Sequence, residues 1–288
     1  MSNLQQRLII GSIASAFAIL ILWLSPYPIF RPIFVFIVTL FISLAASEFY
    51  SFAKNKKFQP VIQIGLAGCI LYPLSVYAGI EYPSAAILPY TILILTLFGS
   101  FLYFFKKGKD PILNISITLF ALIYLAIPLT TWLNVAYFFD LSSGQEGRWW
   151  LLYLLAVTKI TDMGAYFVGS SVGKHKLAPY LSPGKSWEGA LGGVLFGIIT
   201  SVIFHLFSEE IPLKITLFQS ILLGLLLSIM GQVGDLAESL LKRDANLKNS
   251  SQIPGLGGIL DMLDSLVFTS PILYIFLKVQ FAYNHLLG

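Results

Sequence analysis

The sequence predicts an all-α, polytopic integral membrane protein, and three observations support that fold class. Hydrophobic residues make up 57% of the 288 residues and charged residues only 11%, with a mean hydropathy of +0.81. This composition is far too apolar for a soluble domain. The apolar residues form runs of about 20, the length that an α-helix needs to cross about 30 Å of hydrocarbon. Lys and Arg residues gather in alternate loops between these runs.

Nine apolar runs are long enough to be membrane-spanning helices, and turn-forming or charged residues separate them. They cover residues 8–24, 30–53, 60–80, 84–105, 111–139, 149–172, 187–207, 215–234 and 259–281. The first run lacks the small-residue cleavage site of a signal peptide and leads directly into the second, so we interpret it as a retained helix. The chain has no charge-rich stretch long enough for a soluble domain, so we expect one membrane domain.

The positive-inside rule places the N-terminus in the cytoplasm. If nine spans alternate from there, thirteen Lys and Arg residues of the loops lie on the cytoplasmic side and four on the outer side. The C-terminus then lies outside. We therefore expect a multi-pass protein of the inner or plasma membrane, with its active site facing the cytoplasm.

Charged residues are distributed differently in the two halves of the chain. In residues 1–150 they lie in predicted loops, and Glu48 is the chief exception. In residues 151–288 they enter or adjoin predicted helices: Lys159, Asp162, Lys185, Glu188, Asp235, Glu238, Lys242, Asp261 and Asp264. Ionisable side chains inside a membrane are costly and usually functional. We therefore expect scaffold helices in residues 1–150 and a catalytic region in residues 151–288.

Asp162 lies in the middle of the sixth predicted helix, with Lys159 one turn before it on the same face. An intramembrane carboxylate costs at least about 2.5 kcal/mol on insertion scales, so it normally faces a partner or water. An ion pair that joins two helices is one explanation. A ligand site is the other, because Gly164, Gly169 and Gly173 keep this helix thin enough for close approach.

The segment LSPGKSWEGALGG, residues 181–193, predicts a turn followed by a helix. The tripeptide SPG at 182–184 is typical of a turn, and Ser186 is a suitable N-cap for a helix that continues through Glu188. The free N–H groups at the start of this helix, with the ammonium group of Lys185 in reach, suit a phosphate. An ordinary cytoplasmic anchor is the alternative interpretation of Lys185.

The segment that follows the eighth apolar run carries a polar stripe. At positions i, i+3, i+4 and i+7 of one helix lie Asp235, Glu238, Ser239 and Lys242. Arg243 and Lys248 follow, so cations adjoin carboxylates. A helix end that is exposed to water would show the same pattern. The alternative is that these residues are part of a functional site.

In the segment PGLGGILDMLDS, residues 254–265, glycines lead into an apolar run with two aspartates. Asp261 and Asp264 lie one turn apart and can point into one cavity. With Asp235 and Asp162 they predict a nest of carboxylates, which is unstable unless a cation or a proton joins them. Hard oxygen ligands that are open to water suit Mg²⁺. A proton relay or a helix-pairing role is the alternative for the two aspartates.

Acids for a metal ion, cations for phosphates and glycines that admit a ligand occur together in one half of the chain. This combination predicts phosphoryl or nucleotidyl transfer from a soluble nucleotide, because that chemistry depends on positioning and charge neutralisation. We expect Mg²⁺ as the cofactor, with a second cation as an option. The chain has no basic arm or long basic tail, so nucleic acid is not an expected partner.

These motifs resemble the signature of the phosphatidate cytidylyltransferases, also called CDP-diacylglycerol synthases. That signature runs S-x-x-K-R-x4-K-D, a short spacer, and P-G-H-G-G-x-x-D-R-x-D. This sequence has SLLKR from Ser239, then Lys248, then PGLGGILDMLDS. The motifs LSPGKSWEG, DMGAY and GDLAES also match in order and spacing, so the resemblance covers about residues 155–275. The sequence departs from the signature at Asn249, Leu256 and Met262.

The resemblance implies transfer of the cytidylyl group of CTP to phosphatidate, giving CDP-diacylglycerol and pyrophosphate, in membrane phospholipid biosynthesis. The chain is then a nucleotidyltransferase with CTP and phosphatidate as substrates, in contact with the lipid bilayer, and a homodimer is left open. The expected catalytic residues are Asp235, Asp261, Asp264, Lys185, Lys242 and Arg243, and the three aspartates are also the expected metal ligands. The expected substrate-binding residues are Ser182, Ser186, Glu188, Asp162, Ser239, Lys248, Gly255, Gly257 and Gly258. In this scheme Glu188 orients Lys185.

Two alternatives stay open at this point. One is a catalytically altered homologue, because Leu256 and Met262 lack the basic groups of the family signature. The other is a cation-coupled transporter, which also places acids beside broken helices. Transport predicts acids at corresponding positions of two repeats, whereas the acids of this chain cluster in one half.

Overall fold

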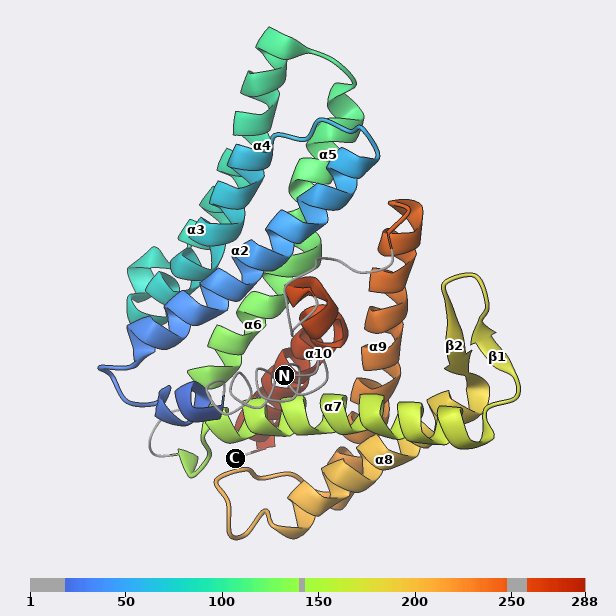
Figure 1. Ribbon diagram of the computed structural model, residues 1–288. Helices are drawn as coiled ribbons and strands as arrows, with labels where there is room; N and C mark the ends of the chain where they lie inside the picture. Colours follow the sequence, from blue (N-terminus) through green and yellow to red (C-terminus); the bar gives the residue numbers. More distant parts are fainter. Residues whose placement is uncertain (1–18, 140–142, 248–257, 288) are drawn as a thin grey trace, which may run out of the picture. The chain divides into compact units, whose positions relative to one another are not determined.

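The protein is predominantly helical in the residues that its structure, a computed structural model, describes: 19–139, 143–247 and 258–287 (Figure 1). Eight helical segments of this part are long and apolar enough to cross a membrane. They correspond to eight of the nine predicted spans, which confirms the all-α polytopic class. Of the first predicted span only residues 19–24 are described, and they are helical. The orientation of the two termini stays a prediction.

The helices and strands follow the chain in a simple order. They are α2 (Arg31–Asn55), α3 (Ile62–Glu81), η1 (Pro83–Ala85), α4 (Leu88–Lys107), α5 (Pro111–Ala121), η2 (Leu122–Ala126), α6 (Ile127–Ala136), α7 (Gly147–Val172), β1 (Lys176–Ala178), β2 (Ser182–Ser186), α8 (Trp187–Leu206), α9 (Leu217–Asp244) and α10 (Ile259–Leu287). Elements α5, η2 and α6 together form one span, Pro111–Ala136.

The chain divides into two compact units by its internal contacts. The first unit contains Met1–Asn134 and Leu241–Leu263, and the second contains Val135–Leu240 and Asp264–Gly288. The end of α9 and the start of α10 therefore group with the N-terminal residues. The division predicted from the charge distribution, with scaffold in 1–150 and catalytic region in 151–288, concerns function and stays a prediction.

In the first unit α2 packs against α3 and η2, and α3 packs against α4 (Figure 1). Hydrogen bonds to Thr118 of α5 hold α2 and the connection that follows it. The Tyr50 hydroxyl donates to the Thr118 carbonyl oxygen at 2.7 Å, and the Val61 N–H donates to Thr118 Oγ1 at 2.9 Å. Membrane helices must satisfy their polar groups internally in this way, because lipid offers no partners. The position of α2 in its unit is thereby well defined.

In the second unit α7 and α8 pack closely, and α9 joins them through small and hydroxyl residues. A Cβ on Gly197 would lie 1.9 Å from Ser228 Oγ and 2.4 Å from Thr161 Oγ1, so a larger residue would force these two hydroxyls to move. Thr161 Oγ1 and Ser228 Oγ are 2.9 Å apart, and Tyr153 OH and Ser201 Oγ are 2.6 Å apart. Small residues that admit a neighbouring backbone and hydrogen bonds between helices are the usual determinants of packing in membranes.

A short antiparallel hairpin, β1 and β2, connects α7 to α8 and contacts both helices at one end (Figure 1). The sequence predicted a turn at 182–184, and this was wrong. Those residues lie in β2, and the turn comes at residues 179–181. The reason is that β2 pairs with β1, with Ser182 opposite Ala178 and Ser186 opposite Lys176. Cross-strand pairing thus overrides the local turn preference of Ser, Pro and Gly.

Candidate functional site

The hairpin leads directly into α8 because Ser186 caps that helix. Ser186 Oγ accepts a hydrogen bond from the Gly189 N–H at 3.1 Å, which confirms the predicted N-cap. The end of α7 lies against this cap, since a Cβ on Gly173 would be 2.4 Å from Ser186 Oγ. Two predicted motifs, the glycines of α7 and the serine of the hairpin, therefore meet at one point.

Glu188, in the first turn of α8, holds the residues that lead into β1. Its carboxylate accepts hydrogen bonds from the Lys174 and His175 backbone N–H groups at 3.2 Å, and His175 Nδ1 lies 2.6 Å from Glu188 Oε1. The sequence predicted that Glu188 orients Lys185, and this was wrong. Lys185 Nζ pairs with Asp235 instead, while the Glu188 carboxylate contacts Lys174 and His175, which precede β1.

A cavity of about 330 Å³ opens inside the second unit, between α7, the hairpin, α8 and α9. The charged, serine and glutamine residues that line it are Asp162, Ser170, Ser182, Lys185, Ser186, Gln232 and Asp235. Five of these were predicted from the sequence as site residues. The structure adds Ser170, and it adds Gln232, which donates to the Ala190 carbonyl oxygen at 3.1 Å. The sequence motifs did not identify either residue as part of a site.

The two carboxylates that line this cavity, Asp162 and Asp235, both form ion pairs. Lys185 Nζ lies 2.7 Å from Asp235 Oδ2, and Lys159 Nζ lies 3.7 Å from Asp162 Oδ2. The four side chains are 25 to 46% exposed, so both pairs can exchange partners when a ligand enters. The ion pair of Lys159 and Asp162, which the sequence left open as one explanation of these charges, is present within α7.

Asp264, on α10, is buried within the same unit. It lies close enough to interact electrostatically with Asp235, Asp162 and Lys159. Its neighbour Ser265 has its hydroxyl 3.5 Å from both carboxylate oxygens of Asp162. Three carboxylates thus share this region with the ammonium groups of Lys159 and Lys185, an arrangement that favours binding of an additional cation.

The three expected metal ligands do not belong to one unit, because Asp261 lies in the first and Asp235 and Asp264 lie in the second. In the described ranges no three His, Cys, Asp or Glu side chains are grouped closely enough to hold a metal ion. The ligand set of Asp235, Asp261 and Asp264 therefore stays a prediction. Mg²⁺ needs only one or two carboxylates when water and substrate phosphates supply its other ligands. Asp162 and Asp235 are such oxygen donors and open into one cavity, so they fit a magnesium ion.

The remaining predicted residues of the described chain belong mainly to the first unit. Lys242 Nζ lies 2.6 Å from Asp261 Oδ1, and the Gly258 N–H donates to Asp261 Oδ2 at 3.2 Å. Arg243 is exposed, and its guanidinium donates to the Leu247 carbonyl oxygen at 3.2 Å. Ser239 is buried in the second unit. Lys248, Gly255 and Gly257 lie outside the described residues, as do the departures Asn249 and Leu256.

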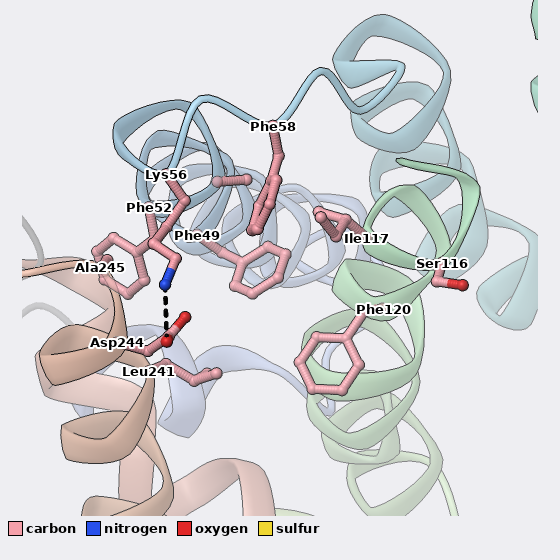
Figure 2. A pocket seen from close by; sticks show the side chains of 11 residues that line it. Phe49, Phe52, Lys56, Phe58, Ser116, Ile117, Phe120, Leu241, Asp244 and Ala245 are labelled. Carbon is pink, nitrogen blue, oxygen red and sulfur yellow. Dashed lines mark hydrogen bonds and ion pairs between the residues drawn. The ribbon is translucent and has the colours of Figure 1, made fainter. Parts of the chain in front are cut away.

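A second cavity, of about 250 Å³, lies within the first unit and has a different character. Figure 2 shows phenylalanine rings on its walls, Phe49, Phe58 and Phe120 among them. Its charged groups are Lys56 and Asp244, whose side chains pair at 2.9 Å (Figure 2). The cavity contains none of the predicted site residues, and its apolar walls do not suit a nucleotide.

The known proteins that this chain resembles include cytidylyltransferases. The chain matches the model of the cytidylyltransferase family over residues 5–280. It is 35% identical to a phosphatidate cytidylyltransferase of Chlamydia pneumoniae, over 96% of this chain and 92% of that protein. A protein of the same name from Chlamydia trachomatis serovar D is 32% identical, over 96% of this chain and 94% of its own length. Another, from Bacillus subtilis, is 43% identical over 50% of this chain and 53% of its own length.

Proposed function

The chain belongs to the cytidylyltransferase family, and we propose that it transfers the cytidylyl group of CTP to phosphatidate, giving CDP-diacylglycerol and pyrophosphate. It is a nucleotidyltransferase and a multi-pass membrane protein. The observation that supports the proposal best is the cavity of the second unit, where Lys185, Asp162 and Asp235 face one another. Family membership leaves the transporter alternative without support.

The reaction needs little covalent help from the protein. A phosphate monoester has a second pKa of about 6, so the phosphate of phosphatidate is largely dianionic at pH 7 and is itself a nucleophile. One of its oxygens forms a bond to the α-phosphorus of CTP, and the bond from that phosphorus to the bridging oxygen of the β-phosphate breaks. The electron pair leaves with pyrophosphate. The main barrier is the mutual repulsion of two polyanions, which positioning and opposite charge overcome.

Within this scheme the residues of the cavity have distinct tasks. Lys185 Nζ lies 2.7 Å from Asp235 Oδ2. When the substrate binds, the lysine leaves this aspartate and binds a phosphate oxygen of the substrate instead. Ser182 lines the same cavity and donates to phosphate, and Ser186 keeps the start of α8 in place. Glu188 holds the hairpin that carries Lys185. Lys242 and Arg243 neutralise further phosphate charge.

The cofactor is a divalent cation, which we propose to be Mg²⁺. Asp162 and Asp235 would hold it, with Asp261 and Asp264 as the further expected ligands. When bound, the cation neutralises charge on the triphosphate and on the pyrophosphate that leaves. Both the apolar spans and the excess of Lys and Arg in alternate loops support a site that faces the cytoplasm from the inner membrane, where CTP is available.

A comparison of two acidic residues tests the assignment. Purified protein in lipid–detergent micelles would be assayed for CDP-diacylglycerol formation as a function of Mg²⁺ concentration. Asp235→Asn should lose at least about 100-fold in kcat/KM, the order expected when a transition-state electrostatic contact is removed. Glu209→Gln, an exposed carboxylate of the same unit, is the matched control and should leave activity unchanged. Full activity of Asp235→Asn would contradict the assignment of this cavity.

A further inference from the structure

The first turn of α10 lacks a cap of its own. The first four N–H groups of a helix have no partner within the helix, and a side chain just before it usually accepts from them. The residue before α10 is Gly258, which has no side chain. The backbone segments of Ile259 and Leu260 are nevertheless in a buried environment, with these residues 7% and 0% exposed. Their N–H groups therefore need an acceptor from elsewhere in the protein.

That acceptor is Glu48, on α2. The Ile259 N–H donates to Glu48 Oε1 at 3.0 Å, and the Leu260 N–H donates to Glu48 Oε2 at 2.9 Å. A carboxylate suits this position because both of its oxygens only accept hydrogen bonds and its charge complements the positive end of the helix dipole. All three residues belong to the first unit. Glu48 is also the acid that the charge distribution marked as an exception within the first half of the chain.

The turn that Glu48 holds also carries Asp261. Asp261 Oδ2 accepts from the Gly258 N–H at 3.2 Å, and its Oδ1 accepts from Lys242 Nζ at 2.6 Å. The contact with Gly258 has the form of the second half of a capping box, in which the third helical residue reaches back to the residue before the helix. Glu48, from another helix, takes the place of the missing cap side chain by accepting from the first two N–H groups of α10. Asp261 is therefore oriented by the same turn that depends on Glu48.

The end of α2 also contacts the end of α9, from which the chain leads to α10. Lys56, near the end of α2, pairs with Asp244 at the end of α9 at 2.9 Å (Figure 2). The segment between Asp244 and Ile259 includes the glycine-rich part of the family signature. The residues on both sides of this segment therefore contact α2 or the residue that follows it. Asp244 does so through an exposed ion pair with Lys56, and the buried N–H group of Leu260 does so by donating to the Glu48 carboxylate.

We propose that Glu48 is a positioning residue of the transferase: its carboxylate fixes the first turn of α10 and, through that turn, the carboxylate of Asp261. The inference rests on the proposed role of Asp261 as a ligand for the cation. Glu48 itself touches neither substrate nor metal in this account. This positioning role explains why α2, a membrane-spanning helix, carries a carboxylate although a charged group there is costly.

The experiment compares Glu48→Ala and Glu48→Gln with the wild-type protein in lipid nanodiscs. Glu81→Gln, a carboxylate of α3 that pairs with Arg31, is the matched control. The first readout is amide hydrogen exchange of peptides that cover the start of α10. Glu48→Ala should raise exchange there by about tenfold, the order expected for loss of a helix cap. Glu48→Gln keeps one acceptor oxygen and should lie between alanine and wild type.

The second readout is the Mg²⁺ concentration that gives half-maximal activity, together with kcat and KM for CTP. Misplacement of Asp261 should raise that concentration and lower kcat, each by about tenfold in Glu48→Ala, with partial recovery in Glu48→Gln. A cap that served only stability would lower the amount of folded enzyme and would leave the Mg²⁺ requirement unchanged. Glu81→Gln should match wild type in both readouts.

The two readouts separate this inference from the proposed function. Exchange is measured without turnover, so unchanged exchange at the start of α10 in Glu48→Ala would overturn the cap. An unchanged Mg²⁺ requirement in Glu48→Ala would overturn the positioning role. Absence of CDP-diacylglycerol formation by the wild-type protein would overturn the proposed function. Exchange of peptides from α7 and α8 reports the overall fold of each variant, and Glu48→Gln decides the matter if Glu48→Ala is globally unfolded.

Discussion

Replacement of Lys185 by Met separates a functional role of this lysine from a structural one. Lys185 and Asp235 form an ion pair of 2.7 Å whose side chains are 25% and 34% exposed. A pair with this much access to water is worth at most about 1 kcal/mol of stability. A charge-assisted hydrogen bond from the lysine to a substrate phosphate is worth about 1.5–3 kcal/mol. The expected loss in kcat/KM is therefore about 10- to 150-fold, and the loss of stability is small.

The assay is CDP-diacylglycerol formation by the purified protein, together with thermal unfolding of each variant. Lys176→Met, an exposed lysine of β1, is the matched control and should retain activity. Lys185→Arg keeps the charge but has a planar fork in place of a point charge, so partial activity is expected. Asp235→Asn is then combined with Lys185→Met to measure the coupling between the two residues.

The double variant distinguishes the two explanations. If the pair only joins the hairpin to α9, neutralising both partners removes the unpaired charge and should restore activity toward wild type. In our account each residue has its own task, so the double variant stays at least as impaired as Lys185→Met. Activity of Lys185→Met within about threefold of wild type would refute the reasoning, because so small a change corresponds to less than about 0.7 kcal/mol.

Three further predictions concern helix packing, the hairpin and metal dependence. Gly197→Ala should destabilise the second unit by about 1–3 kcal/mol through the clash with Ser228 Oγ. Thermal unfolding measures this against Gly184→Ala, where a Cβ would meet nothing within 4 Å. Glu188→Gln should raise KM for CTP about tenfold with a smaller change in unfolding temperature, because the hairpin loses a charged acceptor; an unchanged KM in steady-state kinetics would contradict the role given to Glu188. Chelation of divalent cations should abolish product formation, and added Mg²⁺ should restore it; activity that survives chelation would exclude the cation requirement.

The membrane-spanning helices are the part of the structure that the sequence predicts well. A span needs only length and apolar composition, both of which are local properties, and eight predicted runs coincide with helices. The hairpin is different, because its strands of 3 and 5 residues, KLA and SPGKS, have no recognisable β pattern. Its formation depends on pairing between strands, which local preference does not report.

The site is predictable as a set of residues and much less so as a set of contacts. Motifs identify Asp162, Lys185 and Asp235, and the structure places them on one cavity. The partner of Lys185 was wrongly assigned to Glu188, three positions away, whereas Asp235 is 50 positions away in the chain. The role of Glu48 depends on a contact 211 positions away. Its only sequence signal is a lone acid in an apolar helix combined with a glycine before α10.

The position of the label in the product tests the central claim most directly. Purified protein would be incubated with phosphatidate, Mg²⁺ and CTP that is labelled with ³²P on either the α- or the γ-phosphate. The account predicts that α-label enters the lipid fraction in equal amount to the pyrophosphate released, and that γ-label appears only in pyrophosphate. Entry of γ-label into lipid, or hydrolysis of CTP with no labelled lipid, would contradict cytidylyl transfer by this chain.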